Sequence, residues 1–142
     1  MASENTVNTI NGLDRLIQSE NLQALCKGNL AYLSHSAAVD KNLTLGLLKI
    51  KEIFKDRLIK VFGPQHGFVT DVQDNMVETR DYHHSYFNLP VYSLYGQTRR
   101  PTDQMLEGVD TILIDLQDVG TRVYTYITTL SYMMEACEKK RD

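Results

Sequence analysis

Four short apolar runs alternate with longer segments whose apolar residues recur every three or four positions. The runs are NLAYLS (29–34), LIKVF (58–62), VYSLY (91–95) and TILIDL (111–116). Each run is apolar at successive positions rather than at every second one, which is typical of strands buried on both faces. Strands that alternate with helices indicate parallel pairing through helical crossovers. The sequence therefore predicts a three-layer α/β fold, with a mostly parallel sheet covered by helices on both faces.

The segments between these runs predict four helices. The apolar spacing predicts helices over 13–25, 44–56 and 121–138, and Pro101-Thr102 is typical of the start of a short helix over 102–107. The segment 65–88 has no sustained period, and a connection that long inside one domain is usually functional or partly disordered. We favour a functional loop.

The length of the chain fits one domain. With 142 residues and 42% hydrophobic residues, it can bury a single core without a metal or a disulfide. Residues 1–10 are polar and aperiodic and are expected to form a flexible arm, and residues 11–142 the domain. The charged ending EACEKKRD resembles a truncation as much as a natural end.

Composition and missing motifs exclude several classes of protein. The net charge of -3 comes without a basic stripe, which argues against nucleic acid, and no window resembles a signal peptide or a membrane span. Cys26 and Cys137 lie far apart in helical segments, which is typical of a reducing compartment, so we expect a cytoplasmic protein. No GxGxxG, GxxxxGK[ST] or GxSxG motif occurs, and His83-His84 lacks the spacing of a zinc site. No cofactor and no metal are expected.

Polar residues gather where the predicted strands end. In parallel α/β sheets ligands bind beyond the carboxyl ends of the strands. The four predicted exits are SHS (34–36), GPQHG (63–67), YGQT (95–98) and QDVGTR (117–122), and they hold much of the chain's His, Gly and hydroxyl content. These exits are the predicted working surface.

Asp115 and Asp118 flank the end of the most apolar run. A carboxylate beside a buried strand is poorly solvated and can act as an acid, a base or an electrostatic anchor. The structural alternative is that Asp118 caps the following helix while Asp115 accepts backbone donors in a turn. Both readings stay open at this stage.

Two histidines stand at strand exits. His66 lies between Gln65 and Gly67, where a glycine lets a substrate approach the backbone, and a histidine moves protons near neutral pH. His35 follows the first run. Either ring could instead be a hydrogen-bonded structural residue.

The last predicted helix opens with Gly120-Thr121-Arg122, and helix N-termini attract anions. An ordinary cap is the alternative. Its predicted core positions are Val123, Ile127, Leu130, Met134 and Cys137. That spacing leaves Tyr124 and Tyr126 on other faces, where they could contact a sugar ring or fill an interface.

Four motifs, in this order and spacing, resemble the bacterial exo-β-N-acetylmuramidase family, formerly a domain of unknown function. They are FGPQHGF (62–68), LPVYSLYG (89–96), PTDQMLEGVD (101–110) and IDLQDVGTRVYTYITTLSYMMEA (114–136). A weaker match, LSHSAAVD (33–40), resembles the family's TNHTG-type loop. The resemblance runs from about residue 12 to residue 138.

The resemblance implies an enzyme that removes N-acetylmuramic acid from the non-reducing end of peptidoglycan fragments during cell-wall recycling. It also implies a Rossmann-like domain whose cleft is closed by a C-terminal domain or partner chain. Asp115, Asp118 and His66 become the catalytic candidates. The candidates for binding the amino sugar are His35, Gln65, Gly67, Tyr95, Gln117, Arg122 and Tyr124. From its charge alone, Arg122 is expected to face the lactyl carboxylate.

The sequence departs from the family pattern in two ways. Gln65 stands where the family's EHGF loop has Glu, and an amide cannot exchange a proton as a carboxyl group does. The chain also covers only about the N-terminal third of a typical member. A non-catalytic sugar-binding or interaction module is therefore the alternative function, and exposed apolar surface could favour a homo-oligomer.

Overall fold

The computed structural model describes residues 9–70, 77–120 and 124–140. They form a five-stranded sheet in the order β3-β4-β2-β1-β5. The strands are β1 (Leu30–Ser34), β2 (Leu58–Gly63), β3 (Tyr82–His84), β4 (Leu89–Ser93) and β5 (Thr111–Asp115). The helices are α1 (Gly12–Gln18), α2 (Glu20–Leu25), α3 (Gly46–Phe54), the 3-10 turn η1 (Lys55–Arg57) and α4 (Tyr126–Lys139).

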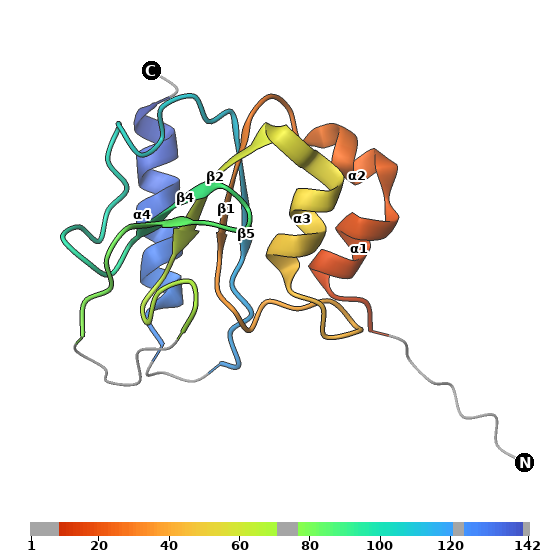
Figure 1. Cartoon of the computed structure of the whole chain (residues 1–142), viewed down its shortest axis with the longest axis horizontal. Coiled ribbons are helices and arrows are strands. Elements are labelled where there is room, and N and C mark those ends of the chain that lie inside the picture. Colours follow the sequence, from red (N-terminus) through yellow and green to blue (C-terminus); the bar gives the residue numbers. More distant parts are fainter. Residues whose placement is uncertain (1–8, 71–76, 121–123, 141–142) are drawn as a thin grey trace, which may run out of the picture.

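Helices cover both faces of the sheet (Figure 1). On one face α1 and α3 pack on Leu30, Leu58 and Val61. On the other face Met133 of α4 packs on Leu33. The predicted three-layer, Rossmann-like α/β architecture is confirmed, because consecutive residues of the central strands send apolar side chains into both layers.

The order in which strands are added to the sheet reverses at β1, with β2 and β4 on one side of it and β5 on the other. From β1 the chain passes through α3 to β2 on one side, and after β4 it returns to add β5 on the other side. β1 pairs in parallel with both neighbours, and Ser34 stands opposite Asp115 in the last register pair of β1 and β5. In open α/β sheets the crevice at such a reversal is where ligands bind.

The first predicted helix, over 13–25, is wrong as a single element. Ser19 has an extended backbone, and its hydroxyl accepts the Leu22 N–H, so Ser19 ends α1 and caps α2. A serine at this position competes with the helical ladder for backbone groups, and apolar spacing does not register that competition.

Two other predicted elements need correction. The segment 65–88, expected to be a loop, contains β3, which pairs antiparallel with β4 at the edge of the sheet. The helix expected over 102–107 is a run of turns, in which the Leu106 N–H reaches the carbonyls of Thr102 and Asp103. Gly108, at φ +72, is the last residue of these turns.

The last helix begins at Tyr126 rather than near residue 121, and residues 121–123 lie outside the described part. Its buried side is Tyr126, Thr129 and Met133, whereas Ile127 and Met134 are exposed. The predicted core face was therefore wrong by about one position. Within the described ranges, no helix combines the length and apolar character needed to cross a bilayer.

Candidate functional site

A hydrogen-bonded bridge joins β1 to β5 at the carboxyl edge of the sheet. The Tyr32 hydroxyl donates to Oδ2 of Asp115 over 2.8 Å, and the Gln117 amide donates to Oδ1 over 3.3 Å. The same Gln117 nitrogen also donates to the carbonyl of Val39 over 3.2 Å. Asp115 thus has both oxygens held by side chains, and Gln117 ties it to the loop after β1.

Asp118 stands in a different environment from Asp115. It is exposed, and its Oδ1 accepts the Gly120 N–H over 2.8 Å within a turn. It does not cap α4, which begins eight residues later. The structural alternative was thus wrong in its details: Asp118 accepts the backbone donor, and Asp115 accepts side-chain donors.

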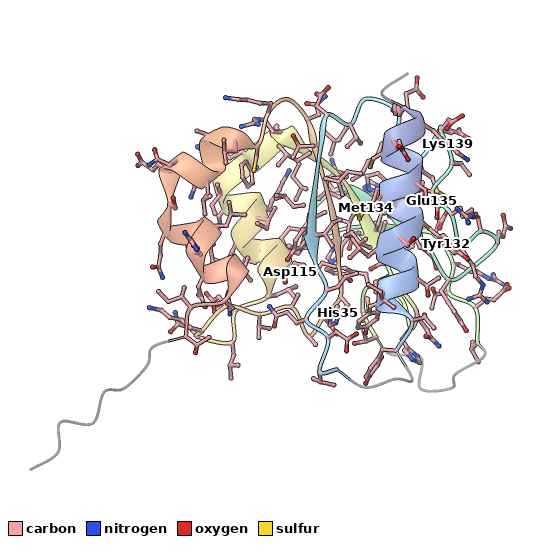
Figure 2. All side chains as sticks on the ribbon, turned by 180° about the vertical axis from the view of Figure 1, so that it is seen from behind. His35, Asp115, Tyr132, Met134, Glu135 and Lys139 are labelled. Atoms are coloured by element: carbon pink, nitrogen blue, oxygen red, sulfur yellow. The ribbon has the colours of Figure 1, made fainter. Side chains whose placement is uncertain are left out.

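His35 follows β1 and is only 2% exposed. Its Nδ1 accepts the Ala37 N–H over 3.3 Å, and its ring lies 5.0 Å from the ring of Tyr126. Burial lowers the pKa of His35, while the negative charges of Asp115 and Asp118 partly offset this effect. Figure 2 shows His35 and Asp115 at the same end of the sheet.

Gln65 contacts the segment that leads into α4. Its side chain is 4% exposed, and its Oε1 accepts the Thr125 hydroxyl over 2.8 Å. The next residue, His66, has a left-handed backbone (φ +70), as does Gly67 (φ +73). A left-handed conformation is uncommon outside glycine and often marks functional loops. The turn closes through the bond from the Gly67 N–H to the Pro64 carbonyl.

A cavity of about 460 Å³ lies beside this turn, at the exits of β2 and β4. Its walls include Gly63, Gly67, Phe68, Glu78, Arg80 and Tyr82. A Cβ at Gly63 would overlap the backbone of Phe68, so only glycine lets the turn fold back on β2. Gly67 lines this cavity, and a Cβ there would come within 3.1 Å of the Thr79 side chain, so its role as a substrate-approach position stays a prediction.

The other predicted binding residues are spread along the edge. Tyr95 follows β4, and the guanidinium of Arg99 lies 3.9 Å from the centre of its ring. Tyr124 stacks on Tyr126 with 5.2 Å between ring centres. Arg122 lies outside the described residues, so its predicted role stays a prediction.

The structure brings the candidates into two neighbouring groups rather than one. Tyr32, Asp115 and Gln117 form the bridge between β1 and β5. At the start of α4, His35 packs against Tyr126 and Gln65 accepts a hydrogen bond from Thr125. Alternation along β1 explains this division, because Tyr32 points toward α3 and Leu33 toward α4. The field of the Asp115 carboxylate nevertheless reaches His35.

The arrangement provides a carboxylate, an imidazole, amides and aromatic rings, which are groups suited to a polar ligand with apolar ring faces. Among the described residues, no three His, Cys, Asp or Glu side chains gather in a way that could hold a metal ion.

Sequence reasoning missed two contributors to this edge. Tyr32 sits inside an apolar strand, and nothing in its neighbours shows that its hydroxyl reaches Asp115. Thr125 was placed inside the last predicted helix, whereas it precedes α4 and its hydroxyl donates to Gln65. Only the alternation of side chains along β1, combined with the strand order, could have indicated Tyr32.

Fold and site together define an open, mostly parallel α/β domain with polar side chains gathered at its topological switch point. Within that class, the chain belongs to the family of N-terminal domains of the exo-β-N-acetylmuramidase NamZ, whose family model matches residues 30–142.

Two relatives support this assignment. Peptidoglycan β-N-acetylmuramidase NamZ of Bacillus subtilis (strain 168) is 38% identical over 128 residues, a match that covers 90% of this chain and 30% of that protein. The crystal structure of a DUF1343 family protein from Bacteroides fragilis shares the fold with a TM-score of 0.78 and 32% identity. That match covers 94% of this chain and 32% of the crystallised one. The chain thus spans about a third of the length of either relative.

Proposed function

We propose that this domain forms the N-terminal part of an exo-acting glycoside hydrolase that removes N-acetylmuramic acid from peptidoglycan fragments. The single observation that carries the proposal is 38% identity to a peptidoglycan β-N-acetylmuramidase over 90% of the chain. The position of the polar residues at the switch point supports it, because this is where an α/β domain binds ligands. The substrate would be an amino-sugar fragment, and a C-terminal domain or partner chain would close the cleft.

In this proposal Asp115 is the leading acid, base or electrostatic stabiliser. Its two oxygens are fixed by Tyr32 and Gln117, and a fixed carboxylate stabilises developing positive charge without reorganising. Asp118 is the second carboxylate candidate, because glycosidases of this kind usually use two. His66, Gln65, Gly67 and Tyr95 would contact the sugar from the β2 and β4 exits, and Tyr124 and Arg122 from the segment before α4.

A second candidate function is a non-catalytic sugar-binding module. The buried amide of Gln65, which accepts a hydrogen bond from Thr125, favours it. An amide can bind a sugar hydroxyl but cannot protonate a leaving oxygen. The two candidates therefore differ in turnover rather than in binding.

The test measures both properties on the purified chain. Release of free N-acetylmuramic acid from a muramic-acid-terminated disaccharide reports turnover, and calorimetric titration with the same disaccharide reports binding. We expect Asp115→Asn to abolish turnover. The matched control is Asp56→Asn in the 3-10 turn before β2, an exposed aspartate at the opposite end of the sheet.

Each outcome separates the candidates. Turnover lost in Asp115→Asn but kept in Asp56→Asn supports the hydrolase. Binding without turnover supports the sugar-binding module. If the chain neither binds nor cleaves the disaccharide, both candidates are wrong for this polypeptide.

We also propose a cytoplasmic location, supported by the free thiols of Cys26 and Cys137.

A further inference from the structure

The imidazole of His35 has one nitrogen with a partner and one without. Nδ1 accepts the Ala37 N–H over 3.3 Å. Nε2 is shielded from solvent, and no hydrogen-bond partner for it exists among the described residues. The whole side chain is only 2% exposed.

This arrangement fixes the protonation of the ring. A neutral imidazole has one N–H donor and one acceptor nitrogen, so a ring whose Nδ1 accepts a hydrogen bond carries its proton on Nε2. Burial of the ring also lowers the pKa of His35, and this effect is larger than the opposing effects of Asp115 and Asp118. His35 therefore presents a neutral Nε2–H donor at the switch point.

A buried donor without a partner is costly. Leaving such a group unsatisfied costs about 1 to 3 kcal/mol, and most buried polar groups in proteins are paired for this reason. The part of the chain that the structure describes does not provide the missing acceptor, and the imidazole instead lies beside the aromatic ring of Tyr126, with 5.0 Å between ring centres.

The charges near His35 restrict which acceptor can bind. Asp115 and Asp118 place negative charge near the ring. A ligand carboxylate would be repelled by both, whereas a carbonyl or hydroxyl oxygen would not. Tyr126 and Tyr124, stacked with 5.2 Å between ring centres, add an apolar wall of the kind on which sugar rings pack.

We propose that the Nε2–H of His35 donates a hydrogen bond to an uncharged oxygen of a bound amino sugar, a hydroxyl or the carbonyl of an N-acetyl group. This inference rests on the proposed function and narrows it, because it makes His35 a binding residue rather than a proton carrier. Nε2 is shielded and the ring of Tyr126 packs against the imidazole, so the proposal requires the Tyr126 side chain to move before an acceptor can reach Nε2.

Nitrogen-15 NMR of the histidine side chains tests the proposal on the unmodified chain. The probes are N-acetylglucosamine, N-acetylmuramic acid and acetate. We expect the free chain to show His35 as the neutral Nε2–H tautomer, and both amino sugars to shift its Nε2 resonance. Acetate, which has an oxygen acceptor but also a negative charge, is expected to leave the resonance in place.

Two variants separate the donor from the shape of the ring. His35→Phe keeps a planar ring without a donor, and we expect it to weaken sugar binding by about tenfold. His35→Gln places an amide N–H near the position of Nε2 and is expected to bind within about threefold of the original chain. Thermal unfolding of each variant checks that it folds, and the titration of the unmodified chain does not depend on either variant.

The outcomes distinguish this inference from the proposed function. The inference alone is wrong if the sugars bind and Asp115→Asn weakens their binding, while the His35 resonance does not move. In that case His35→Phe would bind the sugars as tightly as the original chain. A cationic ring at neutral pH, or a shift with acetate as large as with the sugars, also overturns it. If neither sugar binds, the inference and the proposed function fail together.

Discussion

The Tyr32 hydroxyl donates a 2.8 Å hydrogen bond to Oδ2 of Asp115 and so ties the central strand β1 to the edge strand β5. Tyr32 is buried, and Asp115 belongs to the last residue pair of the two strands. Burial and the charge of Asp115 raise the pKa of Tyr32, so its hydroxyl stays protonated and remains a donor.

We expect Tyr32→Phe to lower the free energy of unfolding by about 1 to 2 kcal/mol, because it removes one hydrogen bond to a carboxylate. Sugar binding should also weaken, because Asp115 loses one of the two donors that orient it. Urea unfolding and calorimetric titration measure the two effects. Tyr92→Phe on β4 is a control from the same sheet, and a loss as large there would contradict a specific role for Tyr32.

Gly46 makes room for this hydroxyl. It is the first residue of α3, and a Cβ there would overlap the Tyr32 hydroxyl and crowd the Ala38 carbonyl. We expect Gly46→Ala to destabilise the domain by about 1 to 3 kcal/mol, as overpacking of a buried position does. Urea unfolding measures this change.

Gly12 provides a matched control for that substitution. It is the first residue of α1, and a Cβ there would have no neighbour within 4 Å among the described residues. Gly12→Ala should be neutral or stabilising by up to about 1 kcal/mol, because alanine restricts the unfolded chain. If Gly46→Ala and Gly12→Ala lower the free energy of unfolding equally, the effect comes from replacing glycine at the first residue of a helix rather than from the space around Tyr32.

The four parallel strands could be predicted from the sequence because their signal is local, whereas the antiparallel strand β3 was missed. β1 is apolar at successive positions and is buried along its whole length, as a strand covered on both faces is. β5 has the same apolar pattern, but it lies at the edge of the sheet and is only half-buried. The phase of α4 could not be predicted in this way. Exposed Ile127 and Met134 are as apolar as buried Met133, so composition alone allows either face.

The candidate site was predictable in its place but not in its contacts. The strand exits locate Asp115, Gln117 and His35 because all parallel strands end at one edge. Asp115 and His35 belong to different faces of that edge. This division depends on the order of the strands in the sheet, which cannot be read from the sequence. The contact between Gln65 and Thr125 joins residues sixty positions apart and has no local signal.

The lowered pKa of His35 predicts how stability changes with pH. Below its ordinary pKa of 6.5, the unfolded chain binds a proton that the folded chain excludes, so the free energy of unfolding falls as the pH falls. For one group the slope is at most about 1.4 kcal/mol per pH unit, and it ends below the folded-state pKa. The effect exists although Asp115 and Asp118 oppose it.

Urea unfolding at several pH values between 5 and 8 tests this sign. His35→Gln should remove the part of the pH dependence that belongs to His35, while the other three histidines are the same in both proteins. If the free energy of unfolding of His35→Gln decreases as steeply with decreasing pH as that of the original chain, His35 is not the group responsible.

The face formed by β5 and α4 predicts self-association. Ile127 and Met134 are 70% and 62% exposed, and a groove of about 730 Å³ runs between β5 and α4. In Figure 2, Met134 lies on the side of α4 turned toward β5, and it lines this groove. Among the described residues, β5 pairs on one side only, with β1, so its other edge keeps unpaired backbone groups. An apolar face beside an open strand edge favours association.

We expect the chain to associate reversibly as its concentration rises. Met134→Lys should shift the equilibrium toward the monomer, because lysine is a good helix former but its charge is unfavourable in an apolar interface. Sedimentation velocity over a range of concentrations measures the shift. The control is Leu25→Lys at the end of α2, where an equally apolar side chain is 72% exposed on the opposite layer. If both substitutions shift the equilibrium equally, general charge rather than this face is responsible; if the chain is monomeric throughout, the apolar face is too small to associate unaided.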